Sequence, residues 1–201
     1  MGAGRIGGRL AHRWAEAGHH VVLGVRDPES ASARAAAEQP GIEAATPGAA
    51  AEGAEVVVLA VPHGVLDEVL AGLGDLTGKV VIDCTNAVQR GMTLKYGHDT
   101  SGAEQLQARL PGAHVFKSFN AQGAENLADP VYDGVRATNF FCGDDPAAAK
   151  VVSGLVEAVG FEPVYAGPLE RARLLEPMMV LWVLSAQAVG TRDLGFKLMR
   201  R

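Results

Sequence analysis

A glycine-rich turn at the start of the sequence is the feature of the chain with the clearest chemistry. Gly2, Gly4 and Gly7 have the G-x-G-x-x-G spacing of a turn that binds the pyrophosphate of a dinucleotide, and a helical pattern follows at once. The N–H groups at the beginning of such a helix attract phosphate oxygens. The residues that we expect to bind the cofactor here are Gly2, Ala3, Gly4, Arg5, Ile6 and Gly7.

The residue that follows the next apolar run indicates which nicotinamide cofactor is bound. An enzyme that uses NAD usually has an acidic residue at this place, which hydrogen-bonds the ribose hydroxyls. This chain has Arg26, about twenty residues after the turn, and a guanidinium group suits a 2′-phosphate. Arg26 therefore favours NADP over NAD, although an ordinary surface arginine is the alternative. Asp27 is expected to point away or to cap the next helix.

The strand that should lead into the glycine turn is missing from the sequence, because only Met1 precedes Gly2. We expect either a start further upstream or a truncated product. If the chain folds as given, the strands on both sides of the missing one keep unpaired backbone groups. The sequence thus predicts a weakened protein that about six added apolar residues, a typical strand length, would stabilise.

Composition is that of a globular protein of one domain, or of one domain with a short appendage. The chain has 201 residues, of which 48% are hydrophobic and 20% charged, and a formal net charge of −5. This charge argues against nucleic acid or an anionic membrane as partners. Cys84 and Cys142 lie in apolar runs and are expected to be buried and reduced, without a metal site. No leader opens the chain, and Met178–Val189 is too short to span a bilayer, so we expect a cytoplasmic protein.

Apolar runs of strand length alternate with helical patterns along the chain, which predicts an α/β fold of the doubly wound Rossmann type. We expect a mostly parallel sheet with helices on both faces, its first strand missing, and a small helical part at the C-terminus. Residues 1–143 would form the dinucleotide-binding domain, and residues 144–201 would pack on it and form a dimer interface. The predicted strands cover residues 21–25, 42–44, 55–62, 79–86, 114–120, 138–143 and 161–165.

Polar residues gather where the predicted central strands end, the edge at which parallel sheets bind ligands. Asn86 and Asn120 could hydrogen-bond a cofactor carboxamide or orient an acceptor, with turn capping as the alternative. Lys117 lies within an apolar strand and could face the cleft to hold an acidic group, or extend to solvent from an edge. His63 could donate a proton or be a simple loop residue. The charged residues Glu170, Arg171, Arg173 and Glu176 are expected to form pairs on a helix surface.

Several motifs occur in an order that resembles one protein family. The motifs are Gly2 to Gly8, Leu23 to Asp27, Leu59 to Pro62, Ile82 to Asn86, Val115 to Asn120 and Gly167 to Pro177. Together they resemble the F420-dependent NADP oxidoreductases and the related predicted dinucleotide-binding enzymes. The dinucleotide domain is also similar to that of pyrroline-5-carboxylate reductases and to the reductase domain of ferric-reductase membrane proteins.

The resemblance implies a homodimer that binds NADP(H) and exchanges hydride with a deazaflavin coenzyme, F420. It assigns Arg26 to the 2′-phosphate, and it places Val61, Pro62 and Asn86 beside the cofactor. Val25 and Ser30 depart from the serine and lysine that members of the family often have there. Three alternatives stay open: reduction of a flavin, metal or imine, a reductase of the pyrroline-carboxylate type, and an NADP-binding sensor without catalysis.

Overall fold

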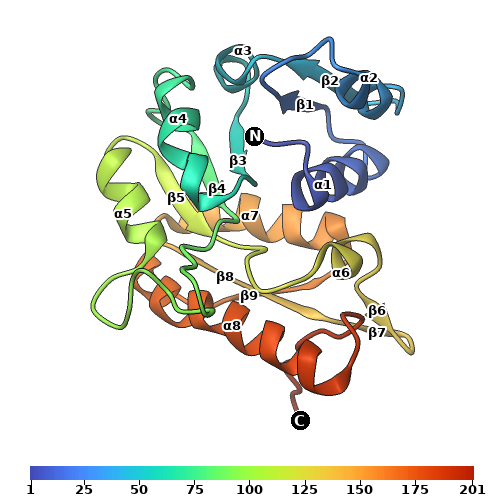
Figure 1. The fold of residues 1–201 in the computed structure, drawn as a ribbon, viewed down its shortest axis with the longest axis vertical. Helices are drawn as coiled ribbons and strands as arrows, with labels where there is room; N and C mark the ends of the chain where they lie inside the picture. Colours follow the sequence, from blue (N-terminus) through green and yellow to red (C-terminus); the bar gives the residue numbers. More distant parts are fainter.

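The computed structural model describes residues 1–201 and shows an α/β fold of the Rossmann type, as the alternation of apolar patterns predicts (Figure 1). Nine strands and eight α-helices follow one another with two short 3-10 helices, η1 (His63–Val65) and η2 (Leu169–Arg171). The strands are β1 (Val21–Gly24), β2 (Ile42–Ala45), β3 (Val56–Leu59), β4 (Val80–Asp83), β5 (His114–Lys117), β6 (Val131–Tyr132), β7 (Val135–Arg136), β8 (Thr138–Gly143) and β9 (Glu162–Tyr165). The helices are α1 (Arg5–Glu16), α2 (Ala31–Ala37), α3 (Pro47–Glu52), α4 (Leu66–Ala71), α5 (Gly102–Arg109), α6 (Ala124–Ala128), α7 (Pro146–Val159) and α8 (Ala172–Val189).

The main sheet has five strands in the order β3-β4-β5-β8-β9. Its pairs are parallel except β5 with β8, which run antiparallel. The register aligns Leu59 with Asp83, and Asp83 with Lys117. The carboxyl ends of β3, β4 and β5 therefore lie together at one edge of the sheet, where the chain's candidate site residues were expected.

Helices cover both faces of this sheet. Neighbouring strand residues point to opposite faces, so that Ile82 belongs to one core and Val81 to the other. The first core contains residues of α1 and α7, and the second contains residues of α4, α5 and the start of α8 (Figure 1). Both cysteines are buried, as predicted, and both are free.

The sheet is divided where the first strand was found to be missing. β1 and β2 form a separate parallel pair, and only Met1 and Gly2 lie between β1 and β3. The Met1 amine donates to the carbonyl of Val58, Ala60 N–H donates to the carbonyl of Met1, and Gly2 N–H donates to the carbonyl of Gly24. Beyond these contacts a largely apolar cavity of about 550 Å³ separates the two strands. The division confirms the expectation of a sheet without its first strand.

Three features differ from the sequence prediction. The hairpin β6–β7 and the short helix α4 were not predicted. The last helix is also longer than its most apolar part: Leu169–Val189 counts 21 residues and has the length and composition of a membrane span, whereas the estimate from Met178–Val189 was too short. One side of this helix is buried: Glu176 is ion-paired in the interior, and the helix packs on α5 and β8.

Candidate functional site

The glycines of the N-terminal turn are required by close backbone contacts. Gly2 has a φ of +91°, a conformation that favours glycine. A Cβ on Gly7 would lie 1.9 Å from the carbonyl oxygen of Gly2, so only glycine lets α1 approach the turn so closely. A Cβ on Gly8 would meet nothing nearer than 3.5 Å. The turn is thus built by Gly2 and Gly7, and Gly8 has no comparable contact.

The first turn of α1 is open to a ligand. Its N-cap residue is Gly4, and no side chain caps the helix. A Cβ on Gly4 would have no atom within 4 Å, and a cavity of about 500 Å³ lies beside Gly4 and Arg5. Four backbone N–H groups at the start of a helix lack helical partners, and together with the helix dipole they form a site for an anion. These residues therefore fit the pyrophosphate of a dinucleotide.

Arg26 lies two residues beyond the end of β1, whose last residue, Gly24, accepts the hydrogen bond from Gly2 N–H. Its side chain is exposed. Asp27 turns into the next segment, because its carboxylate accepts a hydrogen bond from Glu29 N–H at 2.9 Å. Ser30 caps α2 through Ala33 N–H. The arginine is consequently free to meet a phosphate, while the neighbouring carboxylate is engaged in the turn, as was expected of it.

Asn86 and Asn120 meet across the carboxyl ends of β4 and β5. Asn86 Nδ2 donates to the carbonyl of Asn120 at 2.9 Å, and Asn120 Nδ2 donates to Asn86 Oδ1 at 3.1 Å. Asn120 also donates to the carbonyl of Leu175 in α8 at 2.7 Å. Asn120 is buried and Asn86 is partly exposed. The sequence prediction placed these two amides at one edge, and the structure joins them directly.

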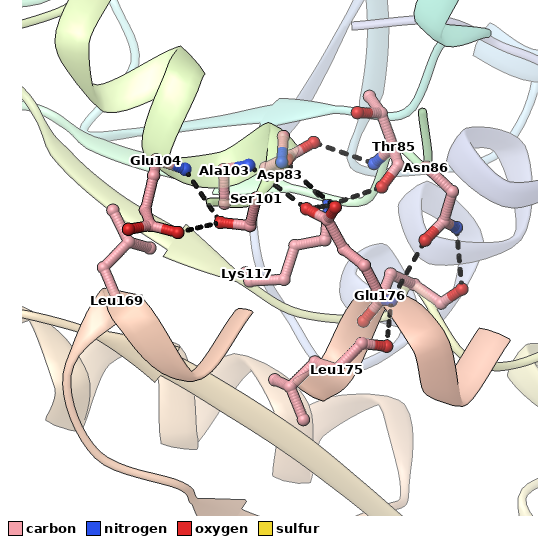
Figure 2. Close-up of polar contacts among 12 residues, drawn as sticks. Asp83, Thr85, Asn86, Ser101, Ala103, Glu104, Lys117, Leu169, Leu175 and Glu176 are labelled. Atoms are coloured by element: carbon pink, nitrogen blue, oxygen red, sulfur yellow. Dashed lines mark hydrogen bonds and ion pairs between the residues drawn. The ribbon is translucent and has the colours of Figure 1, made fainter. Parts of the chain in front are cut away.

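Lys117 is enclosed, contrary to both of its predicted placements. Its Nζ lies 2.8 Å from Asp83 Oδ2, 2.5 Å from the carbonyl of Thr85 and 3.0 Å from Glu176 Oε1 (Figure 2). None of the three charged side chains is more than 2% exposed. The ammonium group has three hydrogens and three acceptors. It neither faces a cleft nor reaches solvent, and it has no hydrogen left for an acidic substrate.

Groups from several elements stabilise the charges of Lys117, Asp83 and Glu176. Burial alone would lower the pKa of Lys117, but attraction and hydrogen bonds from Asp83 and Glu176 outweigh it and raise the pKa. The carboxylate of Glu176 also accepts hydrogen bonds from Gly102 N–H at 3.0 Å and Ala103 N–H at 3.1 Å, at the start of α5. The prediction of Glu176 as a surface residue is therefore wrong. Arg173 does form surface pairs, with Glu104 and Glu170.

His63 begins η1, directly after β3 and the neighbouring Val61 and Pro62. Its ring packs edge-on against Tyr96, with ring centroids 6.2 Å apart. Burial lowers the pKa of His63, and the nearby Lys95 lowers it further. Its Nδ1 atom is buried without a hydrogen-bond partner. His63 is therefore neutral at pH 7 and is a weaker candidate for a proton donor than its position in the sequence indicated.

Sequence reasoning missed three residues of this region. Asp83 was counted as part of a strand and Glu176 as part of a helix surface, so the group around Lys117 was not foreseen. Glu125 was also missed, although its Oε1 lies 2.6 Å from Arg5 NH2 in the phosphate turn and 3.2 Å from Arg192 Nε. The one available signal was a lysine inside an apolar strand, because such a charge requires a buried partner.

Comparison with known proteins gives a consistent result. Residues 1–87 match the family model described as NADP oxidoreductase, coenzyme F420-dependent. The chain is 32% identical over 198 residues to the F420-dependent NADP reductase of Methanothermobacter thermautotrophicus. This alignment covers 90% of this chain and 85% of that protein. The enzyme of the same name from Methanothermobacter marburgensis is 33% identical over 201 residues, covering 90% of this chain and 88% of that protein.

Other similar proteins extend the comparison. Metalloreductase STEAP3 of Rattus norvegicus is 31% identical over 177 residues, but this chain spans only 35% of its length. The structure of a protein from Arthrobacter sp. FB24, assigned as an F420-dependent NADP reductase, superposes with a TM-score of 0.90 at 31% identity and covers 99% of this chain and 97% of that one. A reductive aminase and an imine reductase of Aspergillus terreus and an imine reductase of Streptomyces aurantiacus superpose with TM-scores of 0.69–0.70 at 18–22% identity and share the fold.

Proposed function

Because the chain belongs to the family of F420-dependent NADP oxidoreductases, we propose that it binds NADP(H) and transfers hydride between the nicotinamide and coenzyme F420. The observation that carries this proposal is the open start of α1 behind the Gly2–Gly7 contact, with Arg26 placed after the adjacent strand. The start of α1 thus suits the pyrophosphate of NADP, and Arg26 suits its 2′-phosphate.

The residues divide the binding task along the edge of the sheet. In this proposal Gly2, Ala3, Gly4, Arg5, Ile6 and Gly7 form the phosphate turn. Arg26 holds the 2′-phosphate, and Val61 and Pro62 form the wall after β3. Asn86, partly exposed and tied to Asn120, binds the carboxamide at the nicotinamide end.

The chemistry requires little acid–base help from the protein. NADPH, when bound, supplies the hydride, and the protein must hold the two reacting groups about 3–3.5 Å apart. The properties of Lys117 and His63 agree with such a mechanism. Lys117 is buried away from any substrate, and the lowered pKa of His63 disfavours its protonated form, so neither side chain is available as a strong acid. Positioning by Asn86 is then the main contribution of this chain at the reacting end.

Arg26→Glu tests the cofactor assignment. The change replaces a charge-assisted contact with a repulsion, so the affinity for NADPH should fall at least tenfold relative to that for NADH. Fluorescence titration with both cofactors measures this ratio. Arg109→Glu is a control, because Arg109 pairs with Asp67 on the surface away from β1. An equal loss of NADPH and NADH in Arg26→Glu would show that Arg26 is structural.

We further propose a cytoplasmic homodimer in which the part formed by residues 144–201 supplies the interface. The supporting observation is an apolar stripe on α8, where Leu174, Leu181 and Leu184 are each at least half exposed. Such a stripe on a surface helix fits a second copy of the same helix. The remaining part, residues 1–143, would hold the cofactor.

A further inference from the structure

The buried group formed by Lys117, Asp83 and Glu176 is unusual in its composition. It brings two carboxylates and one ammonium group together in the interior, with side-chain exposures of 0%, 1% and 2%. Buried ion pairs of this kind seldom add net stability over an apolar replacement, because desolvation offsets most of the attraction. Net stability therefore does not account for the group, whereas hydrogen bonds to the neighbouring backbone can fix the geometry of the residues beside it.

The contacts of the group converge on the residue before Asn86. Lys117 Nζ donates to the carbonyl of Thr85 at 2.5 Å, and Asp83 Oδ1 accepts from Thr85 N–H at 2.8 Å (Figure 2). Both backbone polar groups of Thr85 are thus held by the charged group. Asn86 follows directly in the chain, so these two contacts restrain the position of its Cα.

The other side of the amide pair is held from α8. Leu175 accepts a hydrogen bond from Asn120 Nδ2 at 2.7 Å, and the next residue, Glu176, binds Lys117 and the start of α5. Asn120 in turn exchanges hydrogen bonds with Asn86. The charged group therefore restrains Asn86 in two ways. It holds the backbone of the preceding residue, Thr85, and it holds the segment of α8 in which Leu175 binds Asn120, the hydrogen-bond partner of Asn86.

We propose that Lys117, Asp83 and Glu176 are positioning residues that fix the Asn86 amide at the nicotinamide end of the site. This inference rests on the proposed function, since it assumes that Asn86 binds the cofactor. Asn86 uses one of its two Nδ2 hydrogens for Asn120 and keeps the other for a ligand. A misplacement of about 1 Å at a reacting group can lower a rate roughly 100-fold while most binding contacts persist.

Glu176→Gln tests the inference with a small change. It keeps the size of the side chain and leaves Lys117 and Asp83 as a balanced pair, but it puts an amide where a carboxylate accepts from Gly102 and Ala103. We expect kcat for NADPH oxidation to fall at least tenfold, with the Kd for NADPH within twofold of wild type. Glu104→Gln is the matched control, because the Glu104–Arg173 pair also joins α5 to α8 without touching Thr85 or Asn86.

A double-mutant cycle separates positioning from general stability. If the charged group acts through Asn86, Glu176→Gln should lower kcat by less than twofold in an Asn86→Ala background. Full additivity of the two losses would overturn the inference. Equal losses of kcat in Glu176→Gln and Glu104→Gln would also overturn it, because both would then report only the docking of α8 on α5.

A measurement without cofactor keeps the inference distinct from the proposed function. Hydrogen exchange of the Asn86 and Asn120 side-chain amides, followed by NMR in the free protein, should accelerate at least tenfold in Glu176→Gln and remain unchanged in Glu104→Gln. Unchanged exchange in both variants would refute the positioning role. Should Glu176→Gln fail to fold, Glu176→Asp withdraws the carboxylate while keeping its charge, and the same readouts apply. Absence of NADPH binding in the wild type would refute the proposed function and leave the exchange result standing.

Discussion

Replacing Lys117 with methionine is the sharpest test of the buried charges. The Lys117→Met variant keeps the volume of the side chain but leaves Asp83 and Glu176 facing each other without a cation. Removal of one partner from a buried ion pair costs about 3–5 kcal/mol. For a domain of this size each kcal/mol lowers the Tm by about 2–4 °C, so we expect a decrease of roughly 6–20 °C.

Thermal unfolding of Lys117→Met and wild type, followed by circular dichroism at neutral pH, measures this effect. Lys197→Met is the control, since Lys197 forms only a surface pair with Glu162, and its Tm should stay unchanged. A loss in Lys117→Met below about 1 kcal/mol would refute the view that the lysine compensates buried charge.

Three further predictions follow from other parts of the structure. Gly7→Ala should weaken NADPH binding at least tenfold in a titration, because its Cβ would overlap the carbonyl of Gly2, whereas Gly8→Ala should bind normally. Burial lowers the pKa of the Met1 amine from 8.0 to about 6, so the unfolded chain binds more protons between these values. The stability of a protein that begins at Met1 should therefore rise by about 2–3 kcal/mol from pH 6 to pH 8. An added upstream apolar strand should raise the Tm and abolish this pH dependence, and a flat profile without the strand would contradict the burial of the amine. Leu181→Asp should convert a dimer to a monomer in light scattering, whereas Val151→Asp on α7 should not; a wild-type monomer would exclude the dimer.

The fold could be predicted because its signals are local. Apolar runs of strand length and the glycine turn identify their elements without knowledge of distant residues. The hairpin β6–β7, which was not predicted, also had a local signal: Asp133-Gly134 is a typical turn sequence, and both residues adopt positive φ. Local signals of this kind are sufficient for the order of strands and helices along the chain, but not for the order of strands in the sheet.

The buried charges could not be predicted for the opposite reason. Glu176 stands in a helix among other charged residues, a pattern typical of a solvated face, and its partner Lys117 is 59 residues away. Only the packing of α8 against the ends of β4 and β5 brings them together. The sequence placed Asn86 and Asn120 at one edge because parallel strands end together, but their mutual hydrogen bonds required the structure.

The central claim is that this chain transfers hydride between NADPH and coenzyme F420. The most direct measurement is the oxidation of NADPH by the purified protein, with and without F420, for the chain as written and for the same chain with an apolar strand placed before Met1. We expect turnover that depends on F420 and that is faster in the extended protein. Binding of NADPH without turnover in either form would contradict the claim and would favour another acceptor or a protein that only senses NADP.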